Sequence, residues 1–484
     1  MPSDRSQIKV AIVGAGISGL SAAYRLLRAA DDAGLKVDCR VFEGAGRTGG
    51  VLKTERVDER VVEHGPDSWL AAKPDVMELV AELGLTNQVI STNESNRRSL
   101  IADDGKLHPL PEGFVMLAPS RLIPFALSPL FSFSGKIRMA LDMVTPPRLA
   151  VTDETVEDFV LRRFGREALV KIVQPMVGGI YVGDVSKLSA RATLPQFVEM
   201  ERRHGSVIRG LMARKDNPHE RTASGARYSM FVTMRDGVST LTNALEAAIG
   251  FDRIEKNVKV QSIRRETSGR WNIDTERDSQ VFDAIVLAIP ARAAAKIVSG
   301  ANEILANKLS KIESASAAVV NLLFKRSDVS QGLNGFGFVV PSTENRTILA
   351  ASVISNKFKG RASDDCVAVR AFAGGVLQPE KLRLPDADIV KLVRADLEYY
   401  LGVKSEPLTE HVTRFPDSMP QYNLGHAGRV QEIMSAVGNM PGIYLAGNSY
   451  HGVGIPDCIS SGNRAAGAVI EYLKSMAKVE SVAT

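Results

Sequence analysis

Residues 8–50 read IKVAIVGAGISGLSAAYRLLRAADDAGLKVDCRVFEGAGRTGG, and this stretch decides the fold. Its opening KVAIV is a short apolar run rich in β-branched residues, which predicts a buried parallel strand. The glycine turn 14–19 follows, and residues 20–30 then place apolar side chains at helical spacing. A second predicted strand, 36–42, ends at Glu43. This order predicts a βαβ unit.

The glycines of the first turn have the spacing of a dinucleotide site. Gly14 permits the tight turn, Gly16 allows a pyrophosphate to approach the backbone, and Gly19 allows close packing of helix on strand. Free N–H groups and the positive end of the helix dipole then favour phosphate. Glu43 can accept hydrogen bonds from ribose hydroxyls. The alternative is a plain βαβ unit without a ligand.

A second glycine-rich turn, GAGRTGG at residues 44–50, carries one cation, Arg47. A simple nicotinamide-binding unit does not need this turn. An extended flavin dinucleotide does, because a second turn can hold its pyrophosphate and ribityl chain. The arrangement resembles the FAD-binding signature of the amine oxidase and protoporphyrinogen oxidase superfamily. That resemblance implies non-covalent FAD, with Arg47 at the flavin site; a solvated loop cation is the alternative.

Composition is that of an ordinary globular protein of two or three domains. The chain has 484 residues, of which 44% are hydrophobic and 24% charged. A net charge of +5 is small for this length and gives no argument for nucleic acid. The three widely spaced cysteines predict no metal site and suit a reducing cytosol. With no secretory signal and no long apolar run, we expect a cytoplasmic protein.

Residues 111–150 are rich in Phe and Leu, and proline interrupts them repeatedly. The segment also carries Arg121, Lys136, Arg138 and Arg148. This pattern predicts short helices. Two interpretations stay open: the apolar side chains line a substrate cavity and pack into a core, or they touch a membrane peripherally at its inner face.

The pattern of strands and helices predicts an α/β fold, α+β overall, with three parts. They are a Rossmann-like FAD-binding domain built from residues 1–92, 230–295 and 420–484, an antiparallel-sheet substrate domain built from residues 93–112, 190–229 and 296–419, and a helical lobe at residues 113–189.

Residues 442–466, GIYLAGNSYHGVGIPDCISSGNRAA, predict a strand, a glycine-rich loop and a helix from about Pro456. The start of that helix could direct its dipole at the carbonyl edge of a flavin ring and stabilise negative charge on the reduced flavin. Another strand–turn–helix unit of the sheet is the alternative.

Four motifs spread over residues 10–462 resemble the protoporphyrinogen and coproporphyrinogen oxidases, flavoenzymes of haem biosynthesis. They are VAIVGAGISGLSAAYRL, HGPDSW, GGIYVGD and AGNSYHGVGIPDCISSG. The resemblance implies six-electron oxidation of coproporphyrinogen III or protoporphyrinogen IX, with O2 as acceptor and release of H2O2. Flavin N5 would take the hydride, so no catalytic side chain is assigned. It further implies product hand-off to a haem-pathway chelatase.

Porphyrinogens are apolar rings that bear carboxylates, so their pocket needs flat apolar walls and one or two cations. By similarity, Phe336, Val339 and Phe372 match ring-clamping positions, and Arg98 matches a carboxylate-binding arginine through an alignment with a one-residue gap. Arg97 or Lys73 could do the same work. A solvated surface position is the alternative for each of these cations.

The resemblance also assigns a set of flavin contacts, with Trp69 or its neighbours near the ring. The cofactor-binding residues it implies are Gly14, Gly16, Ile17, Ser18, Gly19, Glu43, Gly44, Arg47, Gly49, Gly50, Gly65, Pro66, Asp67, Ser68, Val260, Gly447, Asn448, Val453, Gly454 and Ile455. Asp236-Gly237 stands where relatives often have Gly-Gly. His64 and His451 are interpreted as structural.

Other functions stay open at this level. An amine oxidase or a carotenoid-type desaturase would share the fold, but an amine oxidase should show an aromatic cage where MPQYNLGH supplies only Tyr422. A non-catalytic flavin or porphyrin carrier would keep the binding motifs. The cations near residues 73 and 97–98 lean slightly toward the four-carboxylate substrate, and no pattern reports the oligomeric state.

Overall fold

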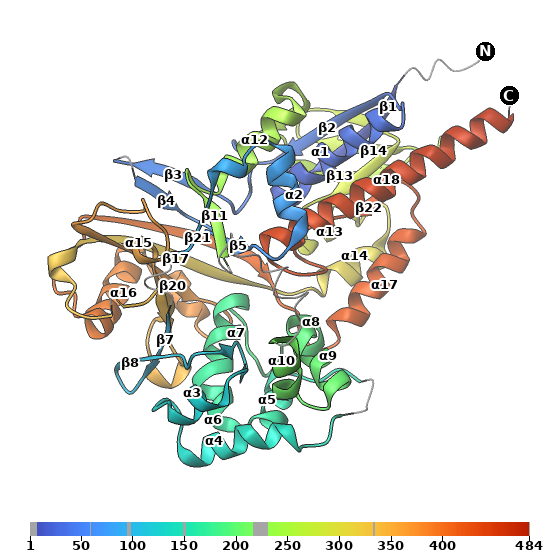
Figure 1. Cartoon of the computed structure of the whole chain (residues 1–484). Helices are drawn as coiled ribbons and strands as arrows, with labels where there is room; N and C mark the ends of the chain where they lie inside the picture. Colours follow the sequence, from blue (N-terminus) through green and yellow to red (C-terminus); the bar gives the residue numbers. More distant parts are fainter. Residues whose placement is uncertain are drawn as a thin grey trace.

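The computed structural model describes residues 7–58, 60–93, 98–148, 152–215, 231–332 and 334–483. Arg97 and residues 216–229 of the predicted substrate domain lie outside them. A parallel sheet with helices, a larger mixed sheet and a helical lobe make up the chain, and the helical lobe lies at the end far from the two termini (Figure 1).

The parallel sheet has the strand order β12-β2-β1-β16-β22. Its strands are β1 (Ile8–Val13), β2 (Val37–Glu43), β12 (Ile254–Lys256), β16 (Ala284–Leu287) and β22 (Ile443–Leu445). Every pair runs parallel, and β16 is buried along its whole length, as a sheet covered on both faces requires. Three distant parts of the sequence thus build one sheet, which confirms the predicted Rossmann-like class.

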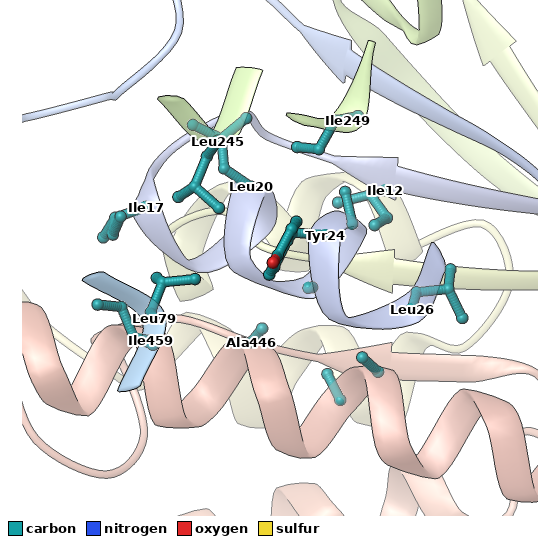
Figure 2. Packing of buried hydrophobic residues seen from close by; sticks show 14 of the residues in the cluster. Ile12, Ile17, Leu20, Tyr24, Leu26, Leu79, Leu245, Ile249, Ala446 and Ile459 are labelled. Atoms are coloured by element: carbon teal, nitrogen blue, oxygen red, sulfur yellow. The ribbon is translucent and has the colours of Figure 1, made fainter. Parts of the chain in front are cut away.

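Helices cover one face of this sheet. They are α1 (Ile17–Asp32), α2 (Pro74–Glu82), α12 (Ser239–Ile249) and α18 (Ile455–Ala483). Figure 2 shows Leu20 and Tyr24 of α1 between Leu245 of α12 and Ile459 of α18. The other face packs against β13 (Val260–Arg265), β14 (Trp271–Thr275), β15 (Ser279–Phe282), α13 (Ala291–Val298), α14 (Glu303–Ser310) and α17 (His426–Gly438).

The second sheet has seven strands in the order β21-β17-β20-β19-β18-β7-β8. They are β7 (Ser99–Asp103), β8 (Lys106–Pro109), β17 (Ser314–Lys325), β18 (Gly337–Val339), β19 (Ile348–Val353), β20 (Cys366–Gly374) and β21 (Thr409–Pro420). All pairs are antiparallel except β18 with β7. The sheet is therefore mixed rather than purely antiparallel as predicted. Helix α16 (Asp386–Leu401) packs on one face.

The helical lobe surrounds its own apolar core. Its helices are α3 (Leu122–Leu127), α4 (Phe133–Ala140), α5 (Val156–Arg163), α6 (Arg166–Ala168), α7 (Gln174–Tyr181), α8 (Ala190–Thr193), α9 (Pro195–His204) and α10 (Val207–Lys215). Proline sites do divide residues 111–148 into short helices, as predicted.

Two predicted domain boundaries differ from the packing. Leu194 and Phe197 belong to the core of the helical lobe, although residues 190–229 were assigned to the substrate domain. Leu305 and Leu309 of α14 pack with the parallel sheet, although residues 296–419 were given to the other sheet. An amphipathic helix reveals its apolar stripe in sequence, but not the partner that covers the stripe.

Short elements complete the chain. They are β3 (Thr54–Val57), β4 (Arg60–Glu63), β5 (Trp69–Leu70), β6 (Val89–Ser91), β9 (Phe114–Val115), β10 (Ala118–Pro119), β11 (Phe231–Met234) and α15 (Ile354–Lys357), with single turns at Thr86–Gln88, Leu141–Met143, Leu169–Val173, Phe251–Arg253, Arg326–Asp328, Ser342–Glu344 and Pro379–Arg383. Among the described residues, no helix is both long and apolar enough to span a bilayer.

Candidate active site

The two glycine turns lie backbone against backbone at the start of α1. The amide of Gly49 donates to the carbonyl oxygen of Ala15 at 2.8 Å, and Gly16 and Gly49 form an isolated bridge. A Cβ on Gly50 would lie 3.3 Å from the Cα of Gly16. The sequence predicted both turns, and the structure brings them together.

The three glycines of the first turn differ in how much room they have for a side chain. Gly14 has φ +100°, and a Cβ on Gly19 would overlap the carbonyl oxygen of Gly14, so both positions need glycine to form the turn. A Cβ on Gly16 would meet nothing within 4 Å. No side chain caps the first turn of α1, so its N–H groups at Ile17 and Ser18 are available to an anion. The turn therefore fits a pyrophosphate.

Glu43 joins the two turns. Its carboxylate accepts hydrogen bonds from the amides of Ala15 and Ala45, each at 2.8 Å. A carboxylate has about four acceptor positions, so ribose hydroxyls can still bind it. The amide of Val258 donates to the carbonyl oxygen of Glu43 at 2.9 Å, which brings the chain just before the predicted contact Val260 to the same corner.

Arg47 holds its own turn in shape. Its Nη1 donates to the carbonyl oxygens of Thr48 and Leu52, each at 3.0 Å, and its Nη2 donates to the carbonyl oxygen of Gly50. Burial lowers the pKa of Arg47, and the charge of Glu43 opposes that shift. The predicted flavin-site arginine therefore holds the second turn through Thr48, Gly50 and Leu52 and is not a free loop cation.

The HGPDSW loop runs against the second turn, since a Cβ on Gly65 would overlap the carbonyl oxygen of Val51. Its polar groups reach the seven-stranded sheet. Arg370 of β20 donates through Nη2 to the carbonyl oxygen of Gly65 and pairs through Nη1 with Asp67 at 2.9 Å. Lys357 Nζ lies 3.4 Å from Asp67 and 3.0 Å from the Ser68 hydroxyl. We call Gly65, Asp67, Lys357 and Arg370 the loop clamp.

The sequence pattern predicts Gly65 and Asp67 as site residues but does not reveal Lys357 and Arg370. Burial alone would raise the pKa of Asp67, but Lys357 and Arg370 hold that pKa well below its usual range. Arg370 is only 2% exposed. The one signal available was a lone arginine within the apolar strand CVAVRAFAG, because a buried cation requires a partner.

Tyr422 fixes the glycine-rich loop before α18. Its hydroxyl donates to the carbonyl oxygen of Asn448 at 2.5 Å and accepts from the amide of Gly452 at 2.8 Å. The side-chain amide of Asn448 also donates to the carbonyl oxygen of Ser418 in β21 at 3.3 Å. Gly447 has φ +123°, and a Cβ there would meet nothing within 4 Å. Helix α18 begins at Ile455, one residue before the predicted start.

The ring of Tyr422 is buried and lies 5.7 Å from that of Tyr181 in the GGIYVGD motif. It also stacks on His426 with ring centroids 4.0 Å apart. Tyr422 therefore supports a loop instead of lining an aromatic substrate cage.

His426 makes stability dependent on pH. Burial lowers the pKa of His426 from 6.5 to about 4. The unfolded chain then binds the proton first, so the free energy of unfolding should fall as pH drops from about 6.5 to about 4, by at most about 1.4 kcal/mol per pH unit. Chemical denaturation at pH 7, 6 and 5 measures this. His426→Phe keeps the stacked ring and should show a flatter profile; equal slopes would contradict the assignment.

An apolar row crosses the face of the seven-stranded sheet that the HGPDSW loop contacts. Strand register aligns Val319, Phe372, Ala350, Val339 and Ile101 as successive neighbours. Phe372 is two residues from Arg370, so both side chains project to the same face. We call these five residues the apolar row. The alternating residues Val320, Ala371, Ala351 and Phe338 enter the core behind the sheet.

Two of the predicted ring-clamping residues, Val339 and Phe372, thus lie in one row with only Ala350 between them. Val339 packs on the core of the helical lobe, and so does Val453 of the predicted flavin loop. The apolar row and the flavin loop therefore both border the core of the helical lobe.

The other predicted substrate residues are placed differently. Phe336 precedes β18 and lies two residues before Phe338, whose side chain enters the core behind the sheet. Extended residues two apart share a face, so Phe336 belongs to the face opposite the apolar row. Arg98 is exposed, and no ion pair of Arg98 occurs within the described parts of the chain. Lys73 pairs with Asp457 in the first turn of α18 at 3.0 Å. The geometry therefore does not bring these cations to the apolar row.

Two further predicted residues have polar partners, and a third is buried. His64 binds Glu55 at 2.9 Å and Thr413 at 2.7 Å through its two ring nitrogens, so a structural interpretation fits it. Asp236 pairs with Arg56. Trp69 is buried in β5.

Comparison with known proteins identifies the class. A family model described as flavin containing amine oxidoreductase matches residues 17–470, and the chain belongs to this family. The coproporphyrinogen III oxidase of Bacillus subtilis (strain 168) is 33% identical over 470 residues, covering 96% of this chain and 98% of the relative. The mitochondrial protoporphyrinogen oxidase of Nicotiana tabacum is 28% identical over 497 residues, with 97% and 96% covered.

A crystal structure agrees with these relatives. A protein of Exiguobacterium sp. 255-15, assigned there as a protoporphyrinogen oxidase, superposes with a TM-score of 0.83 at 30% identity, covering 96% of this chain and 99% of the other. The chain is therefore a flavin-dependent oxidoreductase, and the predictions of an enzyme and of FAD are confirmed. FAD supplies a two-electron acceptor when it is bound.

Proposed function

We propose that the chain oxidises coproporphyrinogen III to coproporphyrin III in haem biosynthesis, with O2 as final acceptor and H2O2 as by-product. Three relatives at 31–33% identity are coproporphyrinogen III oxidases, whereas the two plant protoporphyrinogen oxidases are 27–28% identical. Each pair of electrons and protons removed from the porphyrinogen reduces one O2 to H2O2, so the reaction balances without another reductant.

One observation carries the proposal: Phe372, Ala350 and Val339 of the apolar row are only partly buried and form a continuous apolar wall on the sheet face that the HGPDSW loop contacts. A tetrapyrrole presents a wide apolar ring, which such a wall can hold by burial and by stacking on Phe372. The chain's own part in the reaction is then to orient the ring, support the flavin turns and exclude water. The buried position of Tyr422 disfavours an amine oxidase cage.

A substitution at Phe372 tests this wall. We expect Phe372→Ala to lower kcat/KM for coproporphyrinogen III by roughly tenfold or more. The lost apolar contact with the substrate ring corresponds to a transition-state stabilisation of about 1–3 kcal/mol. Phe372→Leu should retain more activity because it keeps an apolar side chain. Porphyrin fluorescence measures the rate, and flavin absorbance verifies that FAD is retained.

Phe251 offers the matched control. It is 68% exposed and lies in a single turn next to the parallel sheet. Phe251→Ala should keep the wild-type kcat/KM. Equal activity of Phe372→Ala and Phe251→Ala would contradict the placement of substrate on the apolar row.

A second surface supports the proposed peripheral membrane contact. Ile123, Leu127 and Phe133 of α3 and α4 are 76–80% exposed, and Lys136 and Arg121 lie in the same segment. We propose that this surface, residues 121–137, meets an anionic lipid bilayer. Hand-off of the product to a chelatase stays a prediction.

Co-sedimentation with anionic vesicles tests the membrane contact. The fraction of protein that sediments with the vesicles should be several-fold lower for the triple variant Ile123→Ser/Leu127→Ser/Phe133→Ser than for the wild type. The exposed apolar residues Phe251, Ile304 and Leu377 lie on other elements, and the same three-serine change there should leave binding unaltered. Equal loss in both variants would contradict a specific lipid-facing surface.

A further inference from the structure

The loop clamp joins the two halves of the candidate active site through one side chain. On one side, Arg370 binds the carbonyl oxygen of Gly65 and the carboxylate of Asp67 in the HGPDSW loop. On the other side, its guanidinium lies 5.4 Å from the ring centroid of Phe372 in the apolar row. A cation in this position is attracted to the ring face. Arg370 therefore contacts both the HGPDSW loop and the apolar row.

The surroundings of Arg370 leave it room to shift. A cavity of about 30 Å³ is lined by Arg370 together with Asn321 and Arg361. Well-packed interiors resist small displacements, so free volume next to a side chain is what allows it a second position. The Nε of Arg370 is buried and has no hydrogen-bond partner within the described residues. The described contacts of the guanidinium with the loop are therefore made by its two terminal nitrogens.

A purely structural role explains this arrangement poorly. A buried ion pair adds little net stability compared with apolar side chains of similar size. Arg370 stands in a strand that is otherwise apolar, with Val369 and Ala371 beside it. Hydrogen bonding to a loop carbonyl and a loop carboxylate at once fixes the loop in one geometry, which a hydrophobic residue could not do.

We propose that Arg370 is a positioning residue that couples occupation of the apolar row to the flavin-binding loop. This inference rests on the proposed function. A ring stacked on Phe372 restrains the guanidinium, and the guanidinium in turn restrains Gly65 and Asp67. The coupling is reciprocal: a porphyrin on the row tightens FAD binding, and FAD tightens porphyrin binding by the same factor.

The test measures the FAD dissociation constant of the apoprotein with and without coproporphyrin III, the oxidised product, which is not turned over. In the wild type we expect the porphyrin to tighten FAD binding by about fivefold or more. The double variant Asp67→Asn/Arg370→Met removes both charges of this pair, and Lys357 keeps its hydrogen bond to the Ser68 hydroxyl. It should bind FAD at least tenfold more weakly, with a porphyrin effect below twofold.

Arg414 is a matched control from the same sheet. It donates to the carbonyl oxygens of Leu382 and Leu384 and pairs with Asp386, away from the apolar row. Arg414→Met should keep the wild-type porphyrin effect. A wild-type effect in the double variant, or its loss in Arg414→Met, would overturn the inference.

Failure of the proposed function gives a different result. A wild type that binds FAD but no porphyrin would contradict the porphyrinogen assignment. In that case the FAD affinity tests the role of Arg370 by itself. At least tenfold weaker FAD binding by the double variant would support Arg370 as the residue that positions the loop. Unchanged FAD binding would overturn this role.

Discussion

Gly16→Val is expected to fold like the wild type and to lose FAD. The backbone at Gly16 has φ −70°, which valine adopts without strain, and an added Cβ meets no protein atom within 4 Å. The valine side chain would enter the space between the uncapped first turn of α1 and the second glycine turn. We expect FAD affinity to fall by about a hundredfold or more, equivalent to about 2.8 kcal/mol.

Flavin absorbance after gel filtration gives the FAD content, and circular dichroism with thermal melting of the apoprotein gives the fold. Gly467 in α18 is a control, because a Cβ there also meets nothing within 4 Å. Gly467→Val should bind FAD normally. Stoichiometric FAD in Gly16→Val would contradict the position of the pyrophosphate.

The second large effect is expected at Gly462, where α18 crosses α1. A Cβ there would overlap the carbonyl oxygen of Ser18 and lie 3.0 Å from the amide nitrogen of Ala22. Both are backbone atoms, so the helices must separate. We expect Gly462→Ala to lower the free energy of unfolding by about 3 kcal/mol, with a weakened FAD site because α1 carries the first turn.

Gly467→Ala, five residues further along the same helix, is the internal standard. It should raise the free energy of unfolding by about 0.5–1 kcal/mol, since alanine is the better helix former. Guanidinium denaturation of the two variants gives the comparison. Equal midpoints would show that α18 does not pack on α1 as in Figure 2.

The sequence predicted best those features that short-range physics determines. Gly14 and Gly19 are required by a positive φ and a close approach, and Asp104–Gly105, a dipeptide that indicates a tight turn, joins β7 to β8. Strands β1, β2 and β22 of the parallel sheet could be predicted from such local units, because buried parallel strands are continuous apolar runs.

Features that depend on long-range pairing could not be predicted. Arg370 binds Gly65, which lies 305 residues earlier in the chain, and no local pattern reveals such a partner. The placement of Phe336 depended on strand register, since a shift of one residue moves a side chain to the other face. The substrate cations remain predictions, because Lys73 is paired with Asp457 and Arg98 is exposed.

The central claim is tested most directly by porphyrin fluorescence in air. The FAD-loaded protein is mixed with coproporphyrinogen III and, separately, with protoporphyrinogen IX, beside blanks without enzyme. We expect porphyrin fluorescence to grow well above the autoxidation blank, H2O2 to form in step with it, and kcat/KM to be larger for coproporphyrinogen III. Fluorescence no faster than the blank with either substrate, while FAD stays bound, would contradict it.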